Sequence, residues 1–279
     1  MKDPAFAIDP HGLLFDGGKM KALGQEVHES YASGVPFPHI CIDNAFPEEV
    51  LAKVADETGD VQGHDGSFSG KHEMLKTQRT AERLPFYSRS FLYALNSRPF
   101  LQFLEGMTGI KGLIPDPYYN GGGLHETKTG GFLNIHADFN HHESLNLERR
   151  LNILIYLNRD WKEEYGGSFE IWDRRMQKRH GRWAPSFNRF VAFSTASDTM
   201  HGNPDPVNHP DGQSRRSLAL YYYTATWDDT RLKHSTIFKG RPGTKDASGF
   251  GDRVERVVDD VLPPILNRQV KRVRRKLGV

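Results

Sequence analysis

The chain has 279 residues, of which 37% are hydrophobic and 26% are charged, and its formal net charge at pH 7 is +2. That length favours one large domain, or one domain with a helical addition. The charge is too small to indicate nucleic acid or an anionic membrane as a partner. A single cysteine, Cys41, excludes an internal disulfide framework. Because the sequence shows neither a signal-peptide pattern nor a long apolar run, we expect a soluble, cytoplasmic protein.

The first third of the chain predicts helices around one short strand. Residues 1–35 are polar and rich in glycine, so we expect a loosely attached N-terminal arm with one helix near residues 19–33. A strand is predicted at residues 39–43. Pro47, followed by two glutamates, is typical of a helix start.

Residues 59–80 hold few apolar side chains and several glycines. We favour a solvated loop for them; the alternative is a mobile lid over a site whose substrate is negatively charged. After this segment, Ser97 is expected to cap a helix that ends before Gly109.

From about residue 117 the pattern changes to short strands separated by turns. These strands predict a mainly β fold with flanking helices, whose core is a double-stranded β-helix (a cupin-like jelly roll) around a small-molecule site. We accordingly divide the chain into the arm (1–35), one domain (36–230) and a basic, helical C-terminal extension (231–279). The predicted strands cover residues 123–127, 131–139, 150–157, 167–172, 181–184, 189–194, 201–207 and 216–226.

The strand over residues 131–139 carries the first chemical signal. His136 and Asp138 project from one face, while the residues that alternate with them form an apolar face. A neutral imidazole and a carboxylate aimed into one cavity can supply two of the three ligands of a facial iron(II) site. The third ligand should be a histidine far along the chain, and His201 is the best candidate.

An anion site is the second signal. Tyr156 lies on a face of its predicted strand that could enter the same cavity. Arg216 opens an otherwise apolar strand, and a buried guanidinium needs an anionic partner, such as a carboxylate gripped by two hydrogen bonds. We predict Arg216 rather than Arg215, because Arg216 stands in register with the apolar strand and Arg215 would point to the opposite face.

These pieces and their order resemble the prolyl-4-hydroxylase-like branch of the iron(II)- and 2-oxoglutarate-dependent oxygenases, over about residues 36–226. The resemblance implies that iron binds to the triad and that the distal carboxylate of 2-oxoglutarate binds to Arg216 and Tyr156. His125 is either a contact of the cosubstrate or substrate or a histidine at the rim. The segments that carry the resemblance are His136-Ala137-Asp138, Tyr156–Trp161 before Gly166-Gly167, Phe193-Ser194 before His201, and Arg216. His141 and His142, after the first of these, are interpreted as surface groups.

The resemblance further implies the chemistry. A dioxygenase of this kind uses O2 and couples decarboxylation of 2-oxoglutarate to succinate and CO2 with hydroxylation of an unactivated C–H bond, with ascorbate as a supporting reductant. The substrate is expected to be a small molecule or a peptidyl residue. Neither nucleic acid nor a membrane is expected as a partner, and a homodimer stays open.

Three alternatives remain. A metal-dependent hydrolase also uses histidine and aspartate ligands, but it gives no role to Arg216 and Tyr156. A non-catalytic jelly-roll sensor of a metabolite would not need an intact triad. A halogenating oxygenase would need a small residue in place of Asp138.

Overall fold

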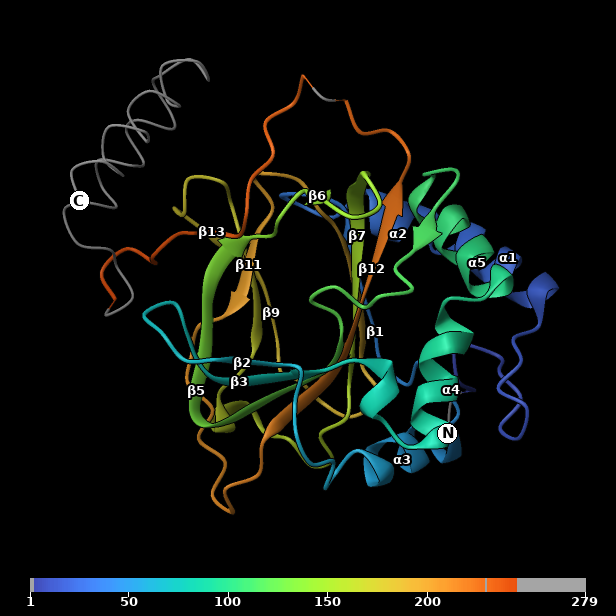
Figure 1. Ribbon diagram of the computed structural model, residues 1–279, viewed down its shortest axis with the longest axis horizontal. Helices are drawn as coiled ribbons and strands as arrows, with labels where there is room; N and C mark the ends of the chain where they lie inside the picture. Colours follow the sequence, from blue (N-terminus) through green and yellow to red (C-terminus); the bar gives the residue numbers. More distant parts are fainter. Residues whose placement is uncertain (1–2, 229, 245–279) are drawn as a thin grey trace.

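The computed structural model describes residues 3–228 and 230–244. Within them the strands form one 13-stranded sheet that curls into a half-open barrel, and helices lie beside it (Figure 1). None of the described helices is long and apolar enough to cross a bilayer. Of the predicted helical C-terminal extension (231–279), residues 231–244 are described, and they hold a strand, β13 (Ile237–Phe238), that pairs with Ala137 and His136; residues 245–279 lie outside the described residues.

Strand β5 (Gly123–Ala137) connects the two layers of the barrel. Its first half pairs with β12 (Arg215–Thr224), and its second half pairs with β11 (Met200–Asn203). The strand bends between the halves at Gly130, whose φ of +85° suits glycine. The sequence predicted two strands here, and the structure shows one bent strand that carries His136 near its end.

The arrangement is a double-stranded β-helix, as predicted. One layer continues from β12 and the other continues from β11, and each predicted strand is present with small shifts of its ends. The first layer adds β7 (Leu147–Tyr156), β10 (Phe190–Ser194) and β1 (His39–Ile42), and the second adds β8 (Phe169–Trp172) and β9 (Arg179–Trp183). Shorter strands lie at the margins: β4 (Ile114–Pro115), β6 (His141–His142) and β13 (Ile237–Phe238).

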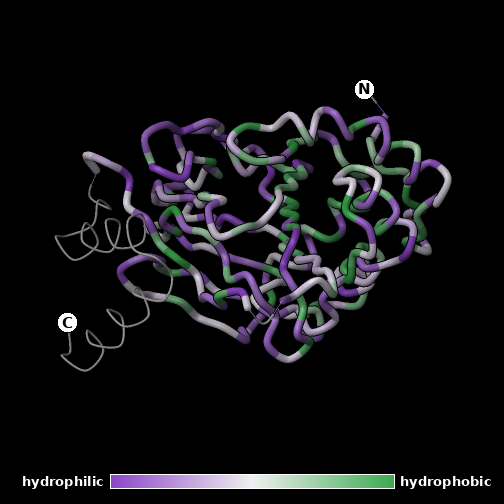
Figure 2. The backbone as a smooth tube through the Cα atoms, turned by 90° about the horizontal axis from the view of Figure 1, so that it is seen from above, coloured by the Kyte–Doolittle hydropathy of each residue, from purple (hydrophilic) through white to green (hydrophobic). Residues whose placement is uncertain are grey.

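The helices cover the outer face of the first layer. Apolar residues of the sheet, such as Ile153, Leu218 and Phe190, share one core with the helices. In Figure 2 the hydrophobic stretches run through the middle of the molecule and into the half beside the N-terminus. The helices are α1 (Gly17–Glu26), α2 (His28–Ala32), α3 (Glu48–Glu57), α4 (Phe86–Leu95) and α5 (Arg98–Thr108), with 3-10 turns at Ala81–Arg83 and Glu163–Tyr165.

The prediction of a loosely attached N-terminal arm is wrong. The Phe6 side chain is fully buried, and its ring centroid lies 4.8 Å from that of Phe46, 4.9 Å from that of Phe103 and 5.2 Å from that of Phe190. The residues around Phe6 are polar enough to suggest solvent, but a few large side chains suffice to dock them in the core.

The preferred prediction of a solvated loop at residues 59–80 is also wrong. These residues contain a hairpin of β2 (Gly66–Phe68) and β3 (Glu73–Arg79). Strand β3 pairs with β5 from Glu73 opposite Leu133 to Arg79 opposite Leu124. Its polar side chains misled the prediction: Lys76 lines the cavity of the site, and Gln78 and Arg79 are buried and make hydrogen bonds to other segments.

Candidate active site

The structure brings the three predicted metal ligands together. One ligand atom from each of His136, Asp138 and His201 lies within 4.8 Å of the others. The Nε2 atom of His136 is 3.5 Å from Oδ1 of Asp138, and Nε2 of His201 is 3.2 Å from Oδ2. The two histidines face each other because β11 pairs with β5 at these residues. Asp138 follows directly after the end of β5.

Hydrogen bonds fix the histidine rings for metal binding. Nδ1 of His136 lies 2.8 Å from the carbonyl oxygen of Asn134, and Nδ1 of His201 lies 2.9 Å from that of Thr199. Since a carbonyl can only accept, each Nδ1 carries the proton and each Nε2 presents a lone pair to the centre of the triad. Burial, with the neighbouring imidazole, lowers the pKa of His136 and so favours its neutral, ligating form.

Asp138 is held by two residues of β7. Nδ2 of Asn152 donates to its Oδ2 at 2.6 Å, and Nη2 of Arg149 lies 3.3 Å from the same atom. Burial alone would raise the pKa of Asp138, but the charge of the Arg149 guanidinium holds it well below its usual value. The donor set is therefore two neutral imidazoles and one ionised carboxylate, which fits a facial iron(II) site with open positions.

Arg215, and not Arg216, shares the cavity with the triad, so the predicted choice between the two is wrong. The Arg215 side chain is buried, its Nε donates to the carbonyl oxygen of Gly167 at 2.7 Å, and its Nη2 donates to the Tyr156 hydroxyl at 3.3 Å. Within the described residues, no carboxylate lies within 4.0 Å of this guanidinium. A buried cation without an anionic partner is suited to bind an anion.

The Arg216 side chain lies on the other face of β12. Its Nη1 donates to the carbonyl oxygen of Ala55 in α3 at 3.0 Å. The error has a physical cause: the large apolar residues of β12, such as Leu218 and Leu220, pack outward under the helices. The face that alternates with them carries Ser217 and lines the cavity.

His125 lines the same cavity, but as a neutral group. Its Nε2 lies 2.8 Å from the carbonyl oxygen of Gly121, so Nε2 is the donor and Nδ1 can only accept. Burial, together with the charge of Lys76, lowers the pKa of His125 to about 3. In this state His125 has no second N–H to donate to a carboxylate.

Two interpretations of nearby residues need correction. His141 and His142 are buried in β6, not surface groups. Nε2 of His141 lies 2.8 Å from Oδ1 of Asn146, and Nε2 of His142 lies 3.5 Å from Oδ1 of Asp116. Both stand outside the triad.

Arg149 and Lys76 are residues of the site that sequence reasoning missed. A register shift between β12 and β7 leaves Arg150 out of the strand pairing and lets Arg149 and Asn152 reach the same carboxylate. Counting alternate residues cannot reveal such a bulge. Arg149 also lay just before the predicted strand, which began at residue 150, and its charged neighbours Glu148 and Arg150 gave no reason to single it out.

The central part of the chain matches one family of known proteins. Residues 122–223 match the family model of the 2OG-Fe(II) oxygenase superfamily. No curated protein sequence matches the chain at a significant level.

Solved structures share the fold at low sequence identity. A prolyl-4-hydroxylase from Pseudomonas putida is 16% identical, with a TM-score of 0.53 over 72% of this chain and 99% of that one. A Trichoplax adhaerens prolyl hydroxylase, solved with a hypoxia inducible factor peptide, is 15% identical, with a TM-score of 0.54 over 74% and 91%. HygX from Streptomyces hygroscopicus, solved with nickel, 2-oxoglutarate and hygromycin B, is 10% identical, with a TM-score of 0.51 over 81% and 94%.

The match covers β5 to β12, which carry the triad, Tyr156 and Arg215. Over residues 122–223 the chain thus matches the 2OG-Fe(II) oxygenase superfamily, which is named for iron(II) and 2-oxoglutarate, and its fold is the one shared by these prolyl hydroxylases of known structure.

Proposed function

We propose that this protein is a 2-oxoglutarate-dependent hydroxylase, in which His136, Asp138 and His201 hold iron(II). The observation that carries the proposal is the convergence of these ligands beside a buried guanidinium, that of Arg215, which lacks a carboxylate partner among the described residues. When bound, iron(II) would couple the reduction of O2 to the oxidation of 2-oxoglutarate, and so supply the oxidising power to attack an unactivated C–H bond.

The protein's own share is binding and orientation. Arg215 and the Tyr156 hydroxyl are placed to bind the distal carboxylate of 2-oxoglutarate, in a contact that a guanidinium makes with two parallel hydrogen bonds. Asn152 and Arg149 contact Asp138 and so orient its carboxylate for binding a metal ion.

Aromatic and aliphatic side chains lie on one side of the metal site. The Phe193 ring centroid lies 4.4 Å from that of His201, and the Phe169 ring lies 5.8 Å from it. Together with Leu154 they line the side of the cavity next to the triad. An apolar wall lowers the local dielectric constant, which strengthens the electrostatic contacts to the carboxylates of the cosubstrate and limits side reactions.

Anaerobic titration tests the proposal. Adding iron(II) and then 2-oxoglutarate should produce the charge-transfer absorption of a chelated keto acid, and admitting oxygen should yield succinate. A protein that binds zinc and hydrolyses a substrate, without this absorption and without succinate, would contradict it. Mass spectrometry of candidate substrates should then show the gain of one oxygen.

The fold does not select the substrate. The structural neighbours include a protein named as a prolyl-4-hydroxylase, one bound to a peptide, and one bound to hygromycin B. One fold thus carries different substrates, which must be chosen by side chains around the mouth of the site. A cytoplasmic location and a homodimer stay predictions.

A further inference from the structure

A second cation enters the triad cavity from the β2–β3 hairpin. Lys76 of β3 lines the same cavity of about 80 Å³ as the triad and Arg215. Only 16% of its side chain is exposed. Its Nζ lies 3.4 Å from Oε2 of Glu73 and 5.0 Å from the centroid of the Phe68 ring. Neither the metal site nor the binding of 2-oxoglutarate proposed above uses this ammonium group.

The register of the β2–β3 hairpin directs the Lys76 side chain into the cavity. A bulge at Leu75, with φ of +49°, shifts the register between β3 and β5. Beyond it, Lys76 stands opposite Thr127, and Gln78 stands opposite His125. The Gln78 amide donates to the carbonyl oxygens of Gly122 and Tyr119 at 2.7 and 3.2 Å, which anchors this end of the strand.

The charged groups in and next to the cavity sum to one net positive charge when both cofactors are counted. With the cofactors bound, iron(II), Arg149, Arg215 and Lys76 carry five positive charges, while Asp138, Glu73 and 2-oxoglutarate carry four negative ones. His125 adds none, because burial and the nearby Lys76 keep its pKa at about 3. An excess charge in a buried site is costly, and one further anion would remove that cost.

Lys76 also lies beside Arg215, because the two residues stand opposite Thr127 of β5 from the strands on either side of it. The charges of Asp138 and of Arg215 both act on the pKa of Lys76, which burial lowers. Because Glu73 keeps a quarter of its side chain exposed, an incoming anion can displace its carboxylate toward solvent.

We propose that the primary substrate of this oxygenase is a small monoanionic carboxylic acid, whose carboxylate replaces Glu73 as the partner of Lys76. The proposal rests on the proposed function. It names the chemistry of the substrate: a free carboxylate at one end, and the C–H bond to be oxidised a short distance away from it.

The test uses the full chain with iron(II) and 2-oxoglutarate under anaerobic conditions. The probes are propionate, benzoate and N-acetyl-L-leucine, each compared with its primary amide. At least one acid should perturb the charge-transfer absorption at concentrations where its amide does not. A panel in which acids and amides act alike, or in which none acts, contradicts the proposal.

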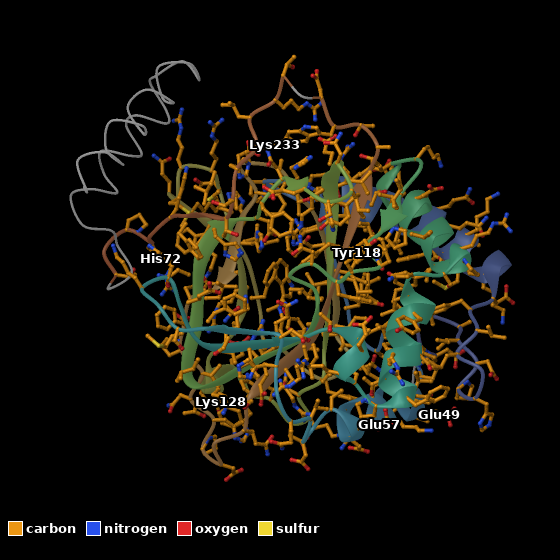
Figure 3. The ribbon with its side chains drawn as sticks, viewed as in Figure 1. Glu49, Glu57, His72, Tyr118, Lys128 and Lys233 are labelled. Atoms are coloured by element: carbon orange, nitrogen blue, oxygen red, sulfur yellow. The ribbon has the colours of Figure 1, made fainter. Side chains whose placement is uncertain are left out.

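Three variants locate the binding site. Lys76→Met should weaken binding of the active acid by about ten- to a hundredfold, as expected for the loss of a charged hydrogen-bond partner. Glu73→Gln should tighten it, because it removes the competing carboxylate. The control is Lys128→Met, at an exposed lysine near the bend of β5 (Figure 3) that does not line the cavity, and this variant should leave the affinity unchanged.

The same titrations separate this proposal from the proposed function. If Lys76→Met instead lowers the affinity for 2-oxoglutarate itself by tenfold or more, Lys76 is part of the cosubstrate site and the substrate assignment is wrong. If the wild-type protein shows no charge-transfer absorption at all, the proposed function fails before any acid is added.

Discussion

Arg215 and Arg216 are neighbours in β12, yet their guanidinium groups lie on opposite faces of the sheet, one beside Tyr156 and the other beside α3. The two positions therefore form a matched pair: equal charge, adjacent in the chain, and different surroundings. A substitution at each site separates binding of the cosubstrate from general effects on the strand.

We expect Arg215→Lys to weaken 2-oxoglutarate binding by about ten- to a hundredfold, since a charge-assisted two-point contact contributes roughly 1.5–3 kcal/mol. Tyr156→Phe removes one neutral donor and should cost about 0.5–1.5 kcal/mol. Anaerobic titration of the charge-transfer absorption measures both. Arg216→Lys is the control and should leave the affinity unchanged; a loss at Arg216 with none at Arg215 would reverse our assignment.

Removing a triad ligand should abolish metal binding. His201→Ala leaves two of three ligands, and we expect the affinity for iron(II) to fall by more than about a hundredfold, beyond the effect of changing a residue that only supports a ligand. Calorimetric titration of the apoprotein provides the measurement. His64→Ala, at an exposed histidine just before the β2–β3 hairpin, is the control. Full metal occupancy in His201→Ala would refute the triad.

A stability prediction concerns the contact of α1 with α5. A Cβ added to Gly24 would lie 2.4 Å from the backbone carbonyl oxygen of Phe103, and neither helix can yield without moving its backbone. Gly24→Ala should therefore lower the free energy of unfolding by about 1–3 kcal/mol. Urea denaturation provides the test.

Gly18→Ala serves as its control in the same helix. There an added Cβ would meet only Oδ1 of Asp16, at 3.4 Å. Because alanine has the better helix propensity, this variant should be neutral or more stable by up to about 1 kcal/mol. Equal effects at Gly24 and Gly18 would show that the tight helix contact does not form.

The stability that Asp65 contributes next to the β2–β3 hairpin should depend on pH. Asp65 accepts hydrogen bonds from the backbone N–H and the hydroxyl of Thr80 at 2.8 and 2.9 Å and also binds Arg83. Although partial burial opposes the shift, these bonds hold the pKa of Asp65 below 3.8. A depressed pKa means that the stabilisation is complete above the unfolded-state pKa and is lost as the pH falls through the folded-state value.

Asp65→Asn should accordingly be less stable than the wild type at pH 7 and at pH 5, and the difference should shrink below pH 4. Urea midpoints at several pH values measure it. Asp198→Asn, at an exposed carboxylate, should show no such trend. A difference for Asp65→Asn that grows on acidification would have the wrong sign.

The sequence predicted the barrel strands and the grouping of the three ligands, because strand alternation and the order of motifs are both visible in the chain. The choice between Arg215 and Arg216 failed, since the rule that apolar residues face a core does not say which side of the sheet the core lies on. Here the helices cover the outer face, so the polar face of β12 is the inner one.

Two of the remaining misses, the docked N-terminal arm and Lys76, have a common origin in long-range contacts. Nothing near Phe6 in the sequence indicates Phe190, and nothing near Lys76 indicates that its strand pairs with β5. Such pairings depend on the whole fold, whereas composition and periodicity report on local segments. Arg149 was missed for a different reason, because a bulge breaks the alternation on which the prediction relied.

The ring contact between Phe6 and Phe190 has a consequence for biosynthesis. At about 5–20 residues per second, a ribosome takes roughly ten to forty seconds to add the residues between them. During that interval the aromatic side chains around Phe6 lack the β10 residue that completes their packing. The nascent chain therefore exposes an aggregation-prone apolar cluster until late in translation. Truncated or stalled products should accordingly depend on chaperones more than the finished protein does.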